Sequence, residues 1–270
     1  MLGPRAAPVV AARSLDRPAG RRAAGRFLVE GPQAVREALT AGALLELLAT
    51  PAAVARHGDL ASAAPRLHLV TEAALALVAD TRTPQGLVGT AALPSTTPAA
   101  ALPAAPRLVT VLAGVTDPGN LGTLVRVSDA VGAHAVLVAP GGAAATDPWG
   151  AKAVRSSAGS IFHLPVAVAA PGEDLTVLLH RRGLRIVAAD ARGHSLHAPG
   201  TERDLAAPTA WVFGGEAHGV PAGWLDVADA VVAVPLAGRA ESLNVAAAAA
   251  VCLYASLRWQ NADRAGIPDR

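Results

Sequence analysis

The stretch LVTVLAGVTDPGNLGTLVRVSDAVGAHAVLVA, residues 108–139, decides the fold class of this chain. It opens with a continuous run of β-branched and aliphatic residues (108–113), continues through a segment whose apolar residues have helical spacing (120–131), and closes with a second apolar run (135–139). Unbroken apolar runs are typical of strands buried on both faces, and a helix between two such strands is typical of a parallel sheet. The stretch therefore predicts an α/β domain built on a parallel sheet.

The same alternation continues on both sides of this stretch. After it, we expect strands at 162–167, 184–189, 210–213 and 230–234, helices near Pro148, Asp174 and Gly219, and a long helix over 242–259. Before it, we expect a smaller α/β unit with strands at 26–30, 44–49, 67–70 and 86–91, and helices at 32–41, around Ala52 and from Thr71. Ligands of parallel sheets bind at the carboxyl ends of the strands, so the loops there are the places to look for chemistry.

Composition along the chain predicts four parts. Residues 93–106, LPSTTPAAALPAAP, contain four prolines and no charged residue, which favours an extended linker. A basic N-terminal arm (1–25) and the smaller α/β unit (26–92) precede this linker, and the parallel-sheet domain (107–270) follows it. The first 26 residues hold six arginines and one acid, which suits a phosphate-binding lip and a solvated terminus about equally.

Composition also excludes several classes of protein. Hydrophobic residues make up 52% of the chain and charged residues 16%, so the chain must bury apolar surface and is not disordered throughout. The apolar run 245–255 is shorter than the roughly 20 residues that span a bilayer, so no membrane association is expected. A single cysteine, Cys252, excludes an intramolecular disulfide, and no hydrophobic signal core follows the arginine-rich start. We therefore expect a cytoplasmic protein.

Three loops that follow expected strands are rich in Gly, Asn, Ser or Glu. They are GVTDPGNLG (114–122), FGGEAHGV (213–220) and VPLAGRAESLN (234–244). Local rules alone make Asn120 and Ser242 helix caps, Arg126 an exposed helical cation, and Glu216 an acid at a helix start. Taken one at a time, these loops do not indicate a function.

Familiar catalytic signatures are absent from the sequence. No G-x-G-x-x-G follows a strand, and there is no G-x-x-x-x-G-K-[ST], G-x-S-x-G or H-E-x-x-H. His194 and His197 are spaced like a metal pair, but no acidic or cysteine partners cluster near them, so a solvated loop is favoured over a zinc site. These absences argue against ordinary Rossmann, P-loop, hydrolase and metal enzymes.

In order and spacing, the three loops together resemble the motifs of the SpoU, or TrmH-like, RNA 2'-O-ribose methyltransferases of the SPOUT superfamily. The first is similar to D-P-G-N-x-G-x-x-x-R (117–126) followed by D-A-x-G-A (129–133), the second to G-x-E-x-x-G (214–219), and the third to P-[ML]-x-G-x-x-x-S-L-N-V-x-x-A (235–248). FLVEG (27–31) and TPQG (83–86) also resemble this family's L30e-like RNA-binding domain. The chain departs from the pattern at Gly215, where many relatives have Asn, and at Ala217, where Gly is frequent.

The resemblance implies a fold and a methyl donor. The segment 234–243 would thread a loop to form a deep trefoil knot, although open sheets are generally unknotted. S-adenosylmethionine would lie bent in the knotted loop, held by main-chain groups near Gly214, Val234, Leu236 and Leu243. Backbone groups in small-residue loops suit such a site, and no metal is implied.

The resemblance also implies roles for five side chains. Arg126 would address the ribose 2'-hydroxyl, either as a base or, as we prefer, by stabilising negative charge on oxygen, because a guanidinium with a pKa above about 12 stays charged. Asn120 would orient the first loop and the ribose, and Glu216 would brace its loop or pair with an arginine. Ser242 and Asn244 would position the hydroxyl and the knot backbone.

The partners implied are RNA and a second copy of the chain. The last helix and the helix of the first motif would meet at a homodimer interface. RNA would contact the N-terminal domain near Arg22 and Arg26, and phosphates would contact Lys152 and Arg155. We expect 23S rRNA as the substrate. A tRNA substrate, a non-catalytic RNA-binding module of the same fold and, less well supported, a nucleotide-dependent oxidoreductase are the alternatives.

Overall fold

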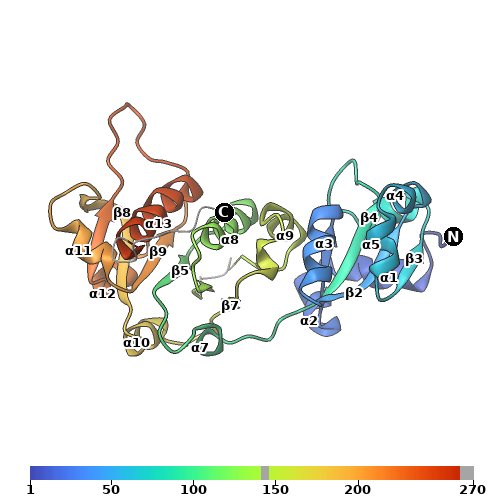
Figure 1. Cartoon of the computed structure of the whole chain (residues 1–270), viewed down its shortest axis with the longest axis horizontal. Coiled ribbons are helices and arrows are strands. Elements are labelled where there is room, and N and C mark those ends of the chain that lie inside the picture. Colours follow the sequence, from blue (N-terminus) through green and yellow to red (C-terminus); the bar gives the residue numbers. More distant parts are fainter. Residues whose placement is uncertain (141–145, 262–270) are drawn as a thin grey trace. The chain divides into compact units, whose positions relative to one another are not determined.

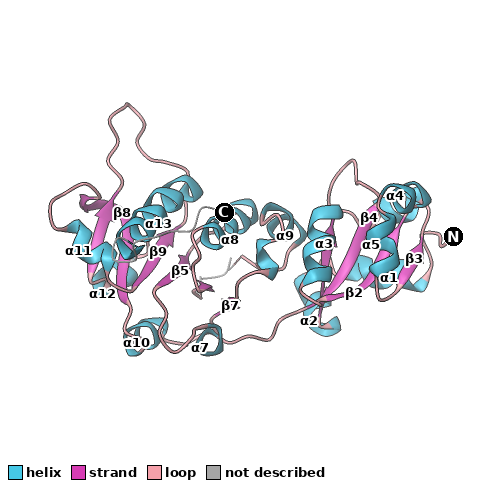
Figure 2. Cartoon of the chain, viewed as in Figure 1, coloured by secondary structure: helices cyan, strands magenta, loops and turns pink. Residues whose placement is uncertain are grey.

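The computed structural model describes residues 1–140 and 146–261 and divides the chain into two compact units. Unit 1 comprises Met1–Ser95 and Asp147–His163, and unit 2 comprises Thr96–Thr146 and Leu164–Arg270. Each unit contains one sheet with helices packed on it (Figures 1 and 2).

Unit 1 is built on a four-stranded mixed sheet in the order β1-β4-β2-β3. Its elements are α1 (Ala7–Ser14), α2 (Pro18–Ala24), β1 (Arg26–Glu30), α3 (Pro32–Thr40), β2 (Leu44–Ala49), α4 (Pro51–Arg56), α5 (Gly58–Ala63), β3 (Leu67–Leu69), α6 (Glu72–Ala76), β4 (Leu87–Ala92), α9 (Ala151–Ser156) and the 3-10 turn η1 (Ser160–Phe162). β4 is antiparallel to β1 and β2, and β3 is parallel to β2. The four strands lie within a residue or so of the predicted positions.

The first 25 residues, expected as a basic arm, form two short helices. Val9, Ala12 and Leu15 are buried in a core cluster with residues of β1, β2 and β4. Proline stands in the first turn of both α1 and α2, where its missing N–H costs nothing. The apolar residues recur every third position over two turns only, and the arginines between them obscure this pattern in the sequence.

The segment 147–163 belongs to unit 1, although we expected it within the larger domain. Phe27 of β1 contacts Trp149 and Phe162, with ring centroids 5.1 and 5.9 Å apart. The predicted strand at 162–167 is also wrong in its first half, because β7 begins at Val166. Gly159, with φ +99°, directs the preceding chain into the η1 turn instead.

Unit 2 confirms the parallel sheet that the opening stretch predicts. Its six described strands follow the order β10-β8-β9-β5-β6-β7, and every described pair is parallel. The elements are α7 (Pro98–Ala101), β5 (Leu108–Ala113), α8 (Pro118–Ala130), β6 (Ala135–Val138), β7 (Val166–Val168), α10 (Leu175–Arg181), β8 (Arg185–Ser195), α11 (Thr201–Ala206), β9 (Thr209–Gly214), α12 (Ala222–Val227), β10 (Ala230–Ala233) and α13 (Val245–Asn261). In residues 1–140 and 146–261, no helix is long and apolar enough to span a bilayer.

Part of the proline-rich linker is folded onto unit 2. Thr97 caps α7 by accepting a hydrogen bond from the backbone N–H of Ala100, and Ala101 and Leu102 are buried in the unit 2 core. The Arg182 guanidinium donates to the carbonyl oxygens of Leu102 and Pro103 at 2.8 and 2.7 Å. This side chain satisfies carbonyls that a proline-rich segment cannot pair within a helix or sheet.

Helices α8 and α13 position the loops of the three motifs. α8 packs on β5 and β6, α13 packs on β8 and β9, and the two helices contact each other (Figure 1). Buried hydrogen bonds join each helix to the sheet: Thr110 with Ser128 at 2.7 Å, and Trp211 with Ser256 at 2.8 Å. The loops that enter both helices are therefore held at the carboxyl end of the sheet.

The helix caps differ from those the sequence suggested. Asp117, rather than Asn120, caps α8, because its carboxylate accepts the backbone N–H of Asn120 at 2.9 Å. Asn244, rather than Ser242, precedes α13 and accepts the N–H of Ala246 at 2.9 Å. Both corrections leave the side chains of Asn120 and Ser242 available for other contacts.

Candidate active site

A cavity of about 410 Å³ opens at the carboxyl ends of β9 and β10 and beside the middle of β8 in unit 2. It is lined by residues from three segments, 189–191, 213–219 and 232–248. The four residues predicted to hold a methyl donor, Gly214, Val234, Leu236 and Leu243, all contribute to this lining. Leu236 and Leu243 are each 39% exposed, so the cavity offers apolar surface that the folded chain itself does not cover.

Glycines let the backbones of two loops meet at one wall of the cavity. A Cβ on Gly214 would lie 2.0 Å from the carbonyl carbon of Gly219, and a Cβ on Gly215 would lie 2.2 Å from the carbonyl oxygen of Gly114. Both distances are far below van der Waals contact, so neither position has room for a side chain. The departure at Gly215 therefore matches the close approach of the 114 loop in this chain.

One hydrogen-bond network joins the three motif loops. The Asn120 side-chain amide donates to the Glu216 carboxylate, and the Asn244 amide donates to the Asn120 side-chain oxygen at 3.1 Å. Glu216 comes from the loop after β9, Asn120 from α8, and Asn244 from the entry to α13. The role predicted for Glu216, bracing its loop, agrees with this contact, whereas no arginine pairs with it among the residues that the structure describes.

Arg126 is not brought to the cavity of its own chain. It is exposed on α8, does not line the cavity, and makes no hydrogen bond or ion pair within residues 1–140 and 146–261. Ser242 and Asn244 do line the cavity, and both are exposed. The structure thus brings Asn120, Glu216, Ser242 and Asn244 together at the cavity, whereas the guanidinium of Arg126 lies outside it.

Asp190 and Arg192 were not predicted from the sequence as site residues. Asp190 lines the cavity just beyond the point where the pairing of β8 with β9 ends. The Arg192 guanidinium lowers the pKa of this carboxyl below its ordinary value, and this effect outweighs the burial that would raise it. The rule that ligands gather after parallel strands points to this position, but no recognised motif contains it.

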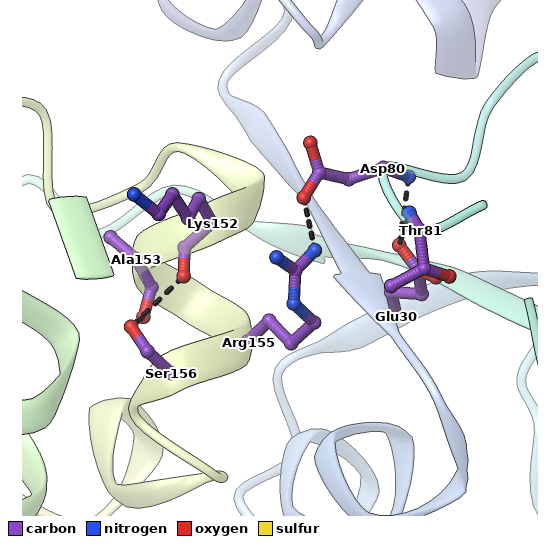
Figure 3. Close-up of polar contacts among 7 residues, drawn as sticks. All are labelled: Glu30, Asp80, Thr81, Lys152, Ala153, Arg155 and Ser156. Carbon is purple, nitrogen blue, oxygen red and sulfur yellow. Dashed lines mark hydrogen bonds and ion pairs between the residues drawn. The ribbon is translucent and has the colours of Figure 1, made fainter. Parts of the chain in front are cut away.

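The residues predicted to contact RNA lie in unit 1 and differ in their pairing. Arg26 pairs with Glu46 at 3.2 Å, and Arg155 pairs with Asp80, whereas Arg22 is exposed. Figure 3 shows Arg155 reaching towards Asp80 while the exposed Lys152 points away from that pair. Within the described parts of the chain, no group of His, Cys, Asp and Glu side chains is placed to hold a metal ion.

Two segments of the chain match known protein families. Residues 107–254 match the SpoU rRNA Methylase family, and residues 8–89 match the MRM3-like substrate binding domain. The first match covers all three motif loops and the cavity. The second covers most of the N-terminal part of unit 1.

The similar proteins include 23S rRNA 2'-O-methyltransferases of two bacteria. The chain is 33% identical over 237 residues to the 23S rRNA (guanosine(2553)-2'-O)-methyltransferase RlmP of Bacillus subtilis, which covers 84% of this chain and 87% of that protein. It is 40% identical over 152 residues to the 23S rRNA (uridine(2479)-2'-O)-methyltransferase of Streptomyces viridochromogenes, covering 55% of this chain and 52% of that protein.

Solved structures resemble the whole chain. An RNA 2'-O ribose methyltransferase matches with a TM-score of 0.79 and 31% identity over 96% of this chain and 98% of that one. The SpoU methyltransferase AviRb of Streptomyces viridochromogenes, in complex with AdoMet, matches with a TM-score of 0.81 and 28% identity over 96% and 99%.

Proposed function

The chain belongs to the SpoU rRNA methylase family, and on that premise we propose that it transfers a methyl group from S-adenosylmethionine to a ribose 2'-hydroxyl of 23S rRNA. The observation that carries the proposal is the cavity, because it joins all four predicted donor-binding residues to the network of Asn120, Glu216 and Asn244. Relatives named for this reaction and a similar structure that contains AdoMet support it.

The cavity fits the methyl donor in size and in chemistry. Its volume of about 410 Å³ lies in the range of sites for small molecules and cofactors. Gly214 and Gly215 expose backbone groups on one wall, and Leu236 and Leu243 supply apolar surface for an adenine ring. We also propose that residues 234–243, which run from β10 to α13 along this cavity, form the threaded segment of a trefoil knot.

The residues around the cavity suit an in-line methyl transfer. When bound, S-adenosylmethionine supplies an electrophilic methyl group on a sulfonium. Ser242 and Asn244 would orient the ribose, and Asn120, held between Glu216 and Asn244, would fix the first loop beside it. As the 2'-hydroxyl loses its proton to water or to an RNA phosphate, negative charge grows on its oxygen and needs a fixed cation. Arg126 is our candidate for that cation.

Because Arg126 lies outside the cavity of its own chain, we propose that the site is completed across a homodimer. α8 and α13 would form the interface. On α13, Val251, Tyr254 and Trp259 are 41%, 52% and 37% exposed, which leaves apolar surface for a partner helix. Leu253 on the same helix is fully buried within the chain and adds nothing to this surface.

We propose that unit 1 holds the RNA through Arg22, Arg26, Lys152 and Arg155. Arg22 and Lys152 are exposed on unit 1, and Arg26 and Arg155 would exchange Glu46 and Asp80 for phosphate oxygens. We also propose that the enzyme acts in the cytoplasm, where it would meet its ribosomal RNA.

Labelling of RNA tests the proposed function. Purified protein is incubated with S-adenosylmethionine that carries a labelled methyl group and with total RNA from a strain lacking the gene, and the product nucleotide is mapped. We expect one 2'-O-methylated ribose in 23S rRNA and loss of transfer, but not of RNA binding, in Arg126→Ala. A labelled tRNA would support the alternative substrate, RNA binding without transfer would indicate a non-catalytic module, and a base-linked methyl group would overturn the reaction.

A further inference from the structure

Asp190 is a nearly buried carboxylate on the cavity wall that none of the three motif loops contains. The register of β8 with β9 ends at Ala188, and Asp190 follows two residues later, where the cavity begins. Its side chain is only 8% exposed. Burial of a charged carboxylate is costly unless hydrogen bonds and a counter-charge compensate for it, so its presence here needs a reason.

The contacts of Asp190 use both of its oxygens. Oδ1 accepts from Nε of Arg192 at 2.7 Å and from the backbone N–H of Arg192 at 3.1 Å, and Oδ2 accepts from Nη2 of Arg192 at 2.9 Å. The backbone N–H of Val220 also lowers the pKa of the same carboxyl. Because Arg192 neutralises its charge and donors surround it, Asp190 is not a free base for the hydroxyl proton. Its contacts fix a position instead.

What Asp190 holds is the end of the loop that carries Glu216. Val220 and Gly219 close this loop, and a Cβ on Gly219 would lie 3.1 Å from Asp190 Oδ2. Gly219 has φ +64°, and its N–H donates to the carbonyl oxygen of Gly215 at 2.9 Å. The turn 215–219 thus lies against Asp190 at one end and is bonded to Asn120, through Glu216, at the other.

Glycine-rich turns lose much conformational entropy when they are ordered. Gly214, Gly215 and Gly219 all lie in this short loop, so without an anchor the cavity wall would sample many conformations before a ligand bound. A wall that is ordered in advance lowers the entropy cost of binding. Ordering of this turn would therefore account for the presence of a costly buried carboxylate at this position.

We propose that Asp190 is a positioning residue for methyl transfer, which orders the 215–219 turn for the methyl donor, and that Arg192 keeps the carboxylate in place. The inference rests on the proposed function, because the donor whose wall is ordered is S-adenosylmethionine. Arg192 is 65% exposed and lies outside the cavity lining, so it acts through Asp190. Neither residue needs to touch the RNA.

Calorimetry with S-adenosylmethionine tests this role. In Asp190→Ala we expect the Kd for S-adenosylmethionine to rise about 10-fold to 100-fold, as for other residues that orient binding groups from behind. The KM for S-adenosylmethionine should rise with it, while the Kd for RNA stays within twofold of wild type. Arg192→Ala should show a smaller rise of the same kind, and Arg192→Lys should recover part of the affinity because it restores a cation.

Asp204→Asn is the matched control. Asp204 also loses a partner in this variant, Arg185 at 2.9 Å, but this pair lies away from the cavity lining. We expect wild-type affinity in the control. Equal losses of affinity in Asp190→Ala and Asp204→Asn, or a twofold or smaller change in Asp190→Ala, would overturn the proposal.

Two further outcomes separate the possible failures. If Asp190→Ala does not fold, Arg192→Ala and Arg192→Lys test the proposal instead, because an exposed side chain tolerates substitution. Identical affinities for S-adenosylmethionine in these two variants and wild type would contradict the proposal. If wild-type protein itself fails to bind S-adenosylmethionine, the proposed function fails and this inference fails with it. Binding by wild type with no response in the variants rejects the inference alone.

Discussion

The cavity of unit 2 and the 147–163 segment of unit 1 are assembled in opposite ways. Backbone groups of glycine-rich loops form one wall of the cavity, where Gly214 and Gly215 approach other backbones within distances that no Cβ permits. The 147–163 segment is attached by side chains, through the Arg21–Asp147 pair and the rings around Phe27. A wall made of backbone demands particular residues in a particular order, whereas a contact made of side chains can be built from many combinations. Only the first leaves a motif in the sequence.

The largest effect should follow a change in the backbone-built wall. Gly214→Ala would place a methyl group 2.0 Å from the carbonyl carbon of Gly219, so the turn must move. Since the loss of two hydrogen bonds of about 1.4 kcal/mol each weakens binding about 100-fold, we expect a loss of that size in affinity for S-adenosylmethionine, measured by calorimetry. Gly223→Ala is the control, because a Cβ there meets nothing within 4 Å. Wild-type affinity in Gly214→Ala would contradict the backbone-built wall.

A change in the side-chain junction should affect stability and leave the cavity intact. Arg21 is 5% exposed and donates to the carbonyl oxygens of Leu15 and Asp16 as well as to Asp147, so Arg21→Ala leaves several acceptors unpaired. Asp147 is 28% exposed, so water can partly solvate its carboxylate in the variant. We therefore expect a loss of about 3 kcal/mol in the free energy of unfolding, the lower end of the range for breaking a buried ion pair. Denaturant unfolding measures it.

Arg13→Ala, which removes an exposed arginine from α1, is the control for this loss. It should change the free energy of unfolding by less than about 0.5 kcal/mol. The affinity of Arg21→Ala for S-adenosylmethionine should equal that of wild type, because all residues lining the cavity belong to unit 2. A loss of stability in Arg21→Ala no larger than in Arg13→Ala would remove the distinction between the two regions.

The same contrast explains how much of the fold followed from the sequence. The strands of both sheets were predictable because apolar runs mark buried strands wherever they pair. The attachment of 147–163 to unit 1 was not, since Arg21 and Asp147 are 126 residues apart and no local pattern marks either residue. The helix α7 was missed because prolines favoured an extended linker, and Arg182, which follows α10 far along the chain, satisfies the carbonyls of that segment.

The candidate site divides along the same line. The donor-binding residues and the members of the Asn120 network lie in loops whose glycine, asparagine and proline content attracts attention in the sequence. Asp190 was not predicted because a single acidic residue after an expected strand is common. Its role at the cavity depends on Val220 and Arg192, which lie beside it. Arg126 was identified from its motif. Its position outside the cavity depends on the direction in which α8 faces, and the spacing of residues in the motif does not indicate that direction.

A smaller effect is expected at the surface pair of unit 1 that Figure 3 shows. Arg155 and Asp80 are partly exposed, so Arg155→Ala should cost at most about 1 kcal/mol in stability. If Arg155 exchanges Asp80 for a phosphate, the variant should bind RNA more weakly. The slope of the logarithm of the binding constant against the logarithm of salt concentration should fall in magnitude by about 1, because one phosphate contact is lost. Asp80→Asn should instead strengthen RNA binding, because it frees the guanidinium. Equal RNA affinities and salt slopes in both variants and wild type would remove Arg155 from the RNA-binding surface.

The smallest effect concerns Cys252, which tests whether the helix behind the cavity is closed in the folded protein. Burial in α13 raises the pKa of its thiol to about 12. At pH 8, only about one thiol in ten thousand would then be a thiolate, the form that reacts. An aromatic disulfide reagent should therefore leave the folded protein unlabelled at pH 8 and label it once in denaturant. Because this is the chain's single cysteine, the signal has one source, and rapid labelling without denaturant would mean that α13 opens and that the cavity lacks a fixed wall.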